Sequence, residues 1–134
     1  MGWGRAVKVL LDTCVVLWGT LSPASLSRQA REMIADPDNV VLVSAASAWE
    51  IATKVRLGGL PGAEKLESNY LDVMEEAGYT MLAIDTASAL RAGRLAAAHR
   101  DPFDRMIAAQ ALGQDIPVLS PDAQLDQLGV RRIW

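Results

Sequence analysis

Five acidic side chains stand near the predicted ends of strands or starts of helices, where a folded α/β chain could bring them together. They are Asp12, Glu50, Asp101, Asp104 and Asp122. Asp12 directly follows a strand-like apolar run, Asp122 follows another by two residues, and Asp101 and Asp104 flank a helix start. Because the carboxyl ends of parallel strands share one edge of a sheet, these carboxylates are expected to meet there.

Carboxylates gathered in this way point to a particular chemistry. Four of them without a counter-ion repel one another, so the cluster needs cations to offset the cost. Hard divalent ions such as Mg²⁺ and Mn²⁺ bind carboxylate and water oxygens and need neither His nor Cys. Two such ions can activate a water and stabilise the leaving oxygen of a phosphodiester. The pattern therefore favours metal-assisted hydrolysis.

Several of these acids also fit ordinary roles at helix starts. Asp101-Pro102 resembles an N-cap followed by proline at the first helical position, and the segment 120–122 resembles another helix start. The segment 47–50 fits a capping box, in which the serine and the glutamate satisfy each other's backbone. On pattern alone, capping competes with a metal role for Asp104 and Glu50, and is compatible with one for Asp101.

Strand-like and helix-like segments alternate along the chain. Short apolar or β-branched runs predict strands over residues 8–11, 40–43, 79–84 and 117–119, with a fifth, edge strand over 130–134. Periodicity, caps and glycine or proline stops predict helices over 25–35, 44–57, 63–77, 85–98, 102–112 and 121–128. Strands separated by helices indicate a three-layer α/β/α fold around a central, mostly parallel sheet of four to five strands.

Length and composition suit one domain over residues 1–134. The chain is 51% hydrophobic, but no apolar run approaches the ~20 residues that cross a bilayer, so no membrane role is expected. A single cysteine, Cys14, cannot form an internal disulfide, which favours a cytoplasmic setting. The net charge of −3 argues against nucleic-acid binding, yet four metal-bound carboxylates would leave −3 + 4 = +1, so both possibilities stay open.

Four segments, in order along nearly the whole chain, resemble the motifs of PIN domains, most closely those of VapC-type toxins of bacterial toxin–antitoxin pairs. The first two are VLLDT at 9–13 with Trp18, and SAASAWEIA at 44–52 with Lys54 and LGGL at 57–60. The third, HRDPFDRMIAAQA at 99–111, is the most specific, and the fourth is VLSPD at 118–122.

The resemblance implies a Mg²⁺- or Mn²⁺-dependent endoribonuclease that leaves a 5′-phosphate and a 3′-hydroxyl. It implies that the catalytic metal ligands are Asp12, Glu50 and Asp104, with Asp122 as the fourth acid. It also implies an RNA substrate, a homodimer, and a separate VapB-like antitoxin that silences the toxin by reaching the acidic pocket.

Auxiliary roles in the resemblance fall to Thr13, Asp101 and Ser120, the two hydroxyls holding carboxylates or waters. The family tends to have His where this chain has Cys14, and Thr where it has Ser120. Neither change removes a carboxylate, although both alter the surroundings of the acids. Arg105 is the cation favoured for a site role, either on an RNA phosphate or as the partner of a neighbouring acid.

The remaining polar and aromatic residues carry weaker signals. His99 is the only histidine, which excludes paired histidines as acid and base within one chain, and it is expected at the surface or behind a metal ligand. Cys14 is expected to be a small buried residue rather than half of a Cys–His pair. Ordinary solvated charge is at least as good an interpretation of Lys54 and Arg56, and core or interface packing is expected for the tryptophans at 3, 18, 49 and 134.

Two other functions compete with a nuclease. One is a non-catalytic binding module that retains the fold, although such a module need not keep mutually repelling acids. The other is a phosphotransfer enzyme with Asp12 as nucleophile, but haloacid-dehalogenase-like enzymes need a second Asp where this chain has Cys14. The chain has no Walker-type or GxGxxG loop, which argues against an NTPase or a dinucleotide enzyme.

Overall fold

Five parallel strands form the centre of the computed structural model, which describes residues 6–134. The strands are β1 (Lys8–Leu11), β2 (Val40–Ser44), β3 (Thr80–Leu82), β4 (Val118–Leu119) and β5 (Arg132–Ile133), in the sheet order β3-β2-β1-β4-β5. All four neighbouring pairs run parallel. The predicted α/β/α fold with a five-stranded sheet is confirmed, and β1, which carries Asp12 at its end, lies in the middle of the sheet.

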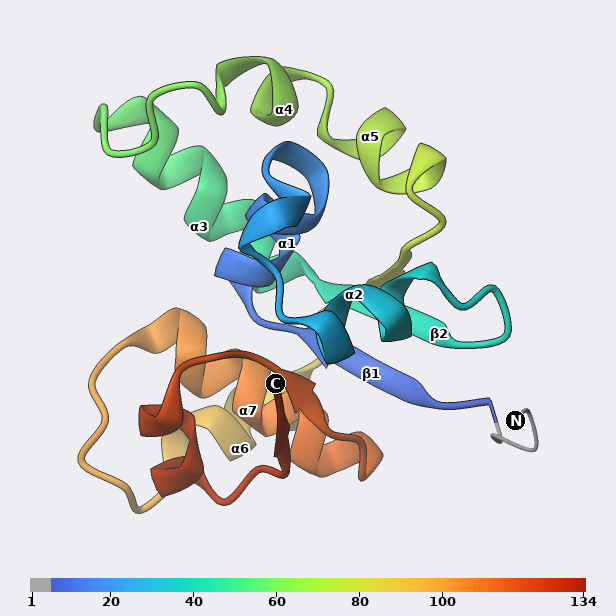
Figure 1. Ribbon diagram of the computed structural model, residues 1–134. Coiled ribbons are helices and arrows are strands. Elements are labelled where there is room, and N and C mark those ends of the chain that lie inside the picture. Colours follow the sequence, from blue (N-terminus) through green and yellow to red (C-terminus); the bar gives the residue numbers. More distant parts are fainter. Residues whose placement is uncertain (1–5) are drawn as a thin grey trace.

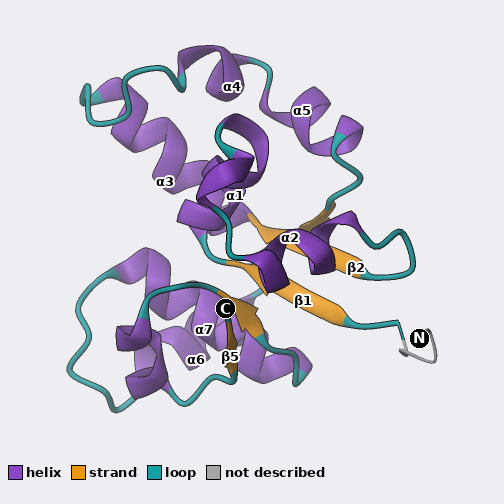
Figure 2. Cartoon of the chain, viewed as in Figure 1, coloured by secondary structure: helices purple, strands orange, loops and turns teal. Residues whose placement is uncertain are grey.

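Helices cover both faces of this sheet. They are α1 (Thr13–Leu21), α2 (Arg28–Ala35), α3 (Ala45–Arg56), α4 (Glu64–Ser68), α5 (Tyr70–Glu76), α6 (Thr86–Arg94) and α7 (Pro102–Gln114), with 3₁₀ turns at Pro23–Ser25 and Ala123–Leu128. Figure 1 shows α1 and α2 on one side of β1 and β2, with α6 and α7 on the other. The strand and helix layers are coloured apart in Figure 2. Within residues 6–134, no helix combines the length and apolar content needed to cross a lipid bilayer.

The strand sequences place the core on both faces because side chains alternate along a strand. Val9 and Leu11 pack into one apolar cluster with α1, α2 and α3, whereas Leu10 packs into a second with α7. The neighbouring strand repeats this division, with Val43 in the first cluster and Leu42 in the second. Continuous apolar runs are the expected sequence of strands buried on both faces.

One helix was absent from the sequence-based expectations. The segment TCVVLWGTL forms α1, although it is β-branched and apolar without a helical period. Asp12 begins this helix by accepting a hydrogen bond from the backbone N–H of Thr13. Burial against the sheet outweighs the low helix propensity of the segment, since tertiary packing routinely overrides such preferences.

Several predicted helix limits were wrong. The helix predicted over 25–35 begins at Arg28, after a 3₁₀ turn, and is capped by Ser27. The helix predicted over 63–77 divides at Asn69, whose side chain donates to the carbonyl of Lys65. The helix predicted to reach 98 ends at Arg94, and α7 continues past Gly113 to a left-handed Asp115 with a φ of 53°.

The capping-box interpretation of segment 47–50 was also wrong. The N-cap of α3 is Ser44, whose hydroxyl accepts from the backbone N–H of Ala46 at 2.9 Å. Ser47 therefore lies inside the helix and is fully buried. Its hydroxyl lies 2.9 Å from that of Thr13, so it ties α3 to α1.

A buried amide holds the start of α3 against α7. Gln110 accepts from the Ser44 hydroxyl at 2.5 Å and donates to the carbonyl of Ala83 at 3.0 Å. Gln110→Leu should lower the free energy of unfolding by about 1–3 kcal/mol, because it leaves the buried Ser44 hydroxyl without its acceptor. Chemical denaturation measures the loss. Gln114→Leu, an exposed position on the same helix, is the control, and equal stability of the two variants would contradict this assignment.

Candidate metal centre

Asp12 stands at the centre of the acidic site and is held from two directions. The register pairs Leu11 with Leu119, so the next residues along the two strands, Asp12 and Ser120, lie side by side. The Ser120 hydroxyl donates to Oδ2 of Asp12 at 2.6 Å, and the Thr13 backbone N–H donates to Oδ1 at 2.7 Å. Asp12 is 6% exposed. Burial raises the pKa of Asp12, and these two hydrogen bonds oppose that rise.

Glu50 reaches the same region from α3 and leaves one oxygen without a hydrogen bond. Its side chain is buried on the second turn of the helix. Oε2 accepts from Lys54 Nζ at 2.5 Å, an ion pair one helical turn apart that raises the pKa of Lys54. Oε1 is fully buried and finds no hydrogen-bond donor among residues 6–134. A buried carboxylate oxygen without a donor is costly, so it is a position at which a cation would be stabilising.

Asp101 and Asp104 both lie at the first turn of α7 but do different things. Asp101 is the predicted N-cap, and its Oδ1 accepts from the backbone N–H groups of Phe103 and Asp104 at 2.9 and 3.2 Å. The Asp104 side chain is not used for capping: its Oδ2 lies 2.8 Å from Nε2 of His99. Burial raises the pKa of Asp104 to about 6, against the opposing effect of the His99 hydrogen bond. Capping therefore falls to Asp101 alone, and the metal role of Asp104 stays a prediction.

Asp122 borders the site from the loop after β4. It is half-buried, and its Oδ1 caps the following 3₁₀ turn by accepting from the backbone N–H of Gln124 at 2.9 Å. Its own N–H donates to the Ser120 hydroxyl at 3.0 Å. Ser120 therefore joins two acids, because it receives from Asp122 and donates to Asp12.

The acids lie close enough to act on one another electrostatically. The negative charges of Glu50 and Asp122 raise the pKa of Asp12, after the larger effect of burial. Those of Asp12 and Asp101 contribute to the raised pKa of Asp104. Helices and strands far apart in sequence thus deliver all five acids to one region at the carboxyl edge of the sheet.

The acidic side chains are of the donor type that a hard divalent cation prefers, although they are not arranged at metal-ligand spacing. Among residues 6–134, no three His, Cys, Asp or Glu side chains already converge at metal-ligand spacing. Glu50 and Asp104 bind Lys54 and His99 instead. The donors available are carboxylate oxygens, which Mg²⁺ and Mn²⁺ prefer, and they include the unpaired Oε1 of Glu50.

Arg105 occupies a different place from either of the two predicted. Its guanidinium donates to four backbone carbonyls, those of Ala92, Leu95, Ala97 and His99, at 2.6–3.0 Å. It therefore holds the end of α6 and the loop between α6 and α7. No acid pairs with Arg105 in the part of the chain that the structure describes.

Two further residues near the acids were not foreseen in their observed roles. Ser47 links α3 to α1, and no sequence pattern distinguishes it from a capping serine. Trp49 is 61% exposed and packs edge-on against Phe103 with ring centroids 4.8 Å apart, so core packing does not describe it. Trp18 and Trp134 do pack beside the core, with their ring centroids 5.9 Å apart. Trp3 lies outside the described residues.

Cys14 is half-buried beside the acids, and its chemistry argues against a nucleophilic role. Its Sγ lies 3.8 Å from Oδ2 of Asp12. Burial, followed by the charge of Asp12, raises the pKa of Cys14 from 9.0 to about 12. His99 is engaged with Asp104 and not with Cys14. The thiol is therefore protonated at neutral pH, unlike the activated cysteine of a Cys–His pair.

Slow alkylation of Cys14 is the expected consequence. Because a thiolate is the reactive form, moving its pKa from 9.0 to about 12 should slow reaction with iodoacetamide at pH 8 by roughly a thousandfold. Mass spectrometry follows the single cysteine directly, and the denatured protein is the control for an ordinary thiol. A native rate equal to the denatured rate would contradict the burial of this thiol.

The PIN domain model matches residues 9–130, which includes every acid of the site. The chain belongs to the PIN-domain family. The family resemblance inferred from the four sequence segments is therefore confirmed.

This PIN domain is similar to Ribonuclease VapC16 of Mycobacterium tuberculosis (strain ATCC 25618 / H37Rv). The two are 42% identical over 64 residues, which is 48% of this chain and 45% of the relative. The match thus spans just under half of that relative's length.

Solved structures share the fold of this PIN domain at low sequence identity. VapBC2 from Rickettsia felis, bound to a DNA fragment from its promoter, aligns with a TM-score of 0.72 and 12% identity, covering 95% of this chain and 98% of the other. VapBC-1 from nontypeable Haemophilus influenzae aligns with a TM-score of 0.66 and 15% identity, covering 95% of this chain and 97% of the other. FitAcB from Neisseria gonorrhoeae aligns with a TM-score of 0.62 and 20% identity, covering 94% of this chain and 96% of the other.

Proposed function

We propose that this PIN domain is a metal-dependent endoribonuclease and the toxin of a toxin–antitoxin pair. The observation that carries the proposal is the gathering of Asp12, Glu50, Asp104 and Asp122 at one sheet edge, with a buried Glu50 oxygen left unpaired. The family match and the relative named a ribonuclease support the same activity. We further propose that residues 1–134 form one domain and that it acts in the cytoplasm.

The residues divide into metal ligands and supports. Asp12, Glu50 and Asp104 would hold Mg²⁺ or Mn²⁺, with Asp122 as the fourth acid. When bound, such an ion supplies activation of a water and stabilisation of the leaving oxygen of the phosphodiester. Ser120 orients the Asp12 carboxylate through its hydroxyl, as expected, whereas Thr13 does so through its backbone N–H, because its hydroxyl pairs with Ser47.

Charge neutralisation answers the objection raised by the acidic composition. Lys54 already compensates Glu50, and bound cations would compensate the remaining acids. Arg56 and Arg100, both exposed, are then available to approach RNA phosphates. The proposed substrate is RNA with unstacked bases, because proteins read RNA sequence mostly in single-stranded segments.

Cleavage of a single-stranded RNA tests the activity. With Mn²⁺ or Mg²⁺ present, the protein should produce internal cuts that leave a 5′-phosphate and a 3′-hydroxyl, which end-specific ligation distinguishes. Products with 2′,3′-cyclic phosphate would contradict a metal-activated water. Failure to bind Mn²⁺ at millimolar concentration in calorimetry would favour a non-catalytic module, and a beryllofluoride adduct on Asp12 would favour phosphotransfer.

We also propose a separate antitoxin as partner. The support is that the VapBC structures sharing this fold are toxin–antitoxin complexes. A cleft of about 450 Å³ between α1 and α4–α5, beside the exposed Leu21, is a suitable surface for an apolar segment of such a chain. Co-purification with the product of a neighbouring short reading frame tests the partnership.

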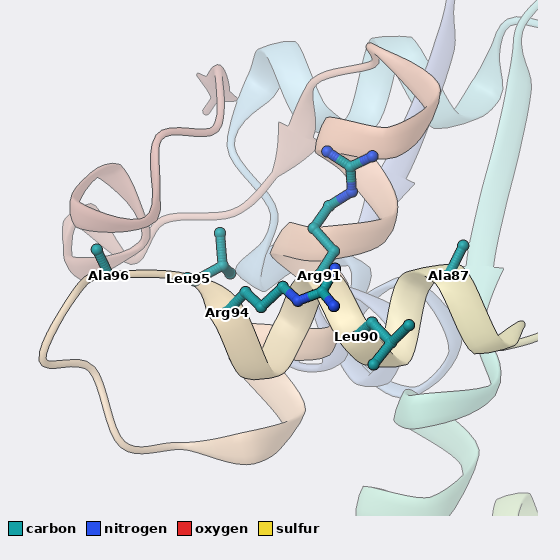
Figure 3. A pocket seen from close by; sticks show the side chains of 6 residues that line it. All are labelled: Ala87, Leu90, Arg91, Arg94, Leu95 and Ala96. Atoms are coloured by element: carbon teal, nitrogen blue, oxygen red, sulfur yellow. The ribbon is translucent and has the colours of Figure 1, made fainter.

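A homodimer is the proposed assembly, through the face formed by α6, the segment after β3 and the start of α3. Leu90 is half exposed on α6, and the exposed Ile84 and Trp49 line one hollow together with Ala92 of the same helix. Beside them lies a hollow of about 560 Å³ lined by residues of α6 and the loop that follows (Figure 3). Contiguous exposed apolar residues of this kind mark protein interfaces.

A charge on this face should separate the two copies. Leu90→Glu is expected to lower the mass measured by light scattering from 2 × 14.4 = 28.8 kDa to 14.4 kDa, because a buried unpaired carboxylate disfavours the interface. Leu71→Glu, at an exposed position on α5, is the control and should leave the mass unchanged. A wild-type mass of 14.4 kDa at micromolar concentration would contradict the dimer.

A further inference from the structure

His99 is the one histidine of the chain, and its side chain is only 9% exposed. It lies on the loop between α6 and α7, five residues before Asp104, and its Nε2 is 2.8 Å from Oδ2 of that aspartate. An ionised carboxylate only accepts hydrogen bonds, so Nε2 is the donor. The imidazole therefore fixes one oxygen of Asp104 and leaves the other, Oδ1, without a hydrogen bond among residues 6–134.

The backbone of His99 is fixed in turn by Arg105. Nη1 of Arg105 donates to the His99 carbonyl at 2.9 Å and to the Ala97 carbonyl at 3.0 Å. Nη2 and Nε donate to the carbonyls of Leu95 and Ala92 at 2.6 and 3.0 Å. Four bonds from one planar, permanently charged group hold the loop in a single shape. Arg105 follows Asp104 on the same helix, so the loop and the carboxylate share one rigid support.

We propose that His99, whose backbone is held by the hydrogen bonds of Arg105, is a positioning residue that orients the Asp104 carboxylate for binding a divalent cation. The inference rests on the proposed metal site and adds a role for a residue outside the acidic set. Hydrogen-bond partners of metal-binding carboxylates typically contribute 10–100-fold to metal affinity. The opposite role, in which His99 occupies Asp104 in competition with the metal, predicts the opposite sign.

The test is calorimetric titration of Mn²⁺ into the full chain at one fixed pH. His99→Leu should bind Mn²⁺ about 10–100-fold more weakly than the wild type. His99→Gln should recover affinity to within a few-fold, because its side-chain amide can donate to Asp104 from a similar place. Arg105→Lys should weaken binding in the same direction, since one ammonium cannot reach four carbonyls. Ala98→Leu, at an exposed position next to His99 on the same loop, is the control and should not weaken binding.

The outcomes separate this inference from the proposed function. If the wild type binds Mn²⁺ and His99→Leu binds it equally well or more tightly, the positioning role is wrong and the metal site stands. If His99→Gln binds as weakly as His99→Leu, the loss reflects packing and the positioning role is also wrong. If the wild type does not bind Mn²⁺, the proposed metal site fails, and the inference fails with it.

Discussion

Replacing Asp12 with asparagine should reduce RNA cleavage by roughly 10²–10³-fold or more, the scale seen when a group that stabilises transition-state charge is removed. The same change should leave the metal-free protein as stable as the wild type or more so. Burial raises the pKa of Asp12, which means that the fold disfavours its ionised form. Asparagine can still accept from Thr13, and the Ser120 hydroxyl can reverse to accept from the amide.

Cleavage rates and melting in a chelator measure the two effects separately. Asp38→Asn removes the same charge from an exposed turn and should alter neither. A variant that melts well below the wild type without metal would show that the Asp12 carboxylate is structural. Retained cleavage by Asp12→Asn would remove the central residue of the proposed site.

Removing divalent metal should abolish cleavage completely, and adding Mn²⁺ should both restore it and raise the melting temperature. A ligand at a hundred times its dissociation constant stabilises a fold by about 2.7 kcal/mol. For a chain of this size that corresponds to a shift of roughly 10 °C. The physical reason is relief of repulsion among Asp12, Glu50 and Asp104, together with pairing of the buried Oε1 of Glu50.

Calcium offers a matched comparison for this second prediction. It supplies the same charge but takes more ligands at longer distances, so it should stabilise the fold with little cleavage. Cleavage that continues in excess chelator would contradict the metal-dependent chemistry. A melting temperature unchanged by Mn²⁺ would contradict binding at a buried acidic site.

The sequence predicted the sheet well because its strands are buried on both faces. Continuous apolar runs such as 8–11 and 40–43 carry a strong signal, and their carboxyl ends coincide in a parallel sheet. This topological rule predicts that Asp12 and Asp122 meet at one edge of the sheet, whereas the role of Ser120 beside Asp12 followed only from the family resemblance. The sequence did not predict α1, because a β-branched apolar segment without helical periodicity carries no pattern that distinguishes a helix.

Side-chain partners were harder to predict than positions. Segment 47–50 satisfies the capping-box pattern, yet a helix begun three residues earlier by Ser44 turns Ser47 into a buried link to Thr13. Arg105 follows Asp104 in sequence, but the two side chains leave the helix in different directions. The guanidinium therefore bonds to carbonyls at the end of α6 and in the loop before α7. Such contacts depend on how α6 and its loop fold back on α7, which local pattern does not encode.

The most direct test of the central claim is anomalous diffraction from crystals of the protein soaked in Mn²⁺. An anomalous peak bonded to carboxylate oxygens of Asp12, Glu50 and Asp104 is the predicted result, with Asp122 in reach of the ion or its waters. Full occupancy of Mn²⁺ elsewhere, with Glu50 still paired to Lys54 and Asp104 bound only by His99, would contradict the proposed metal centre.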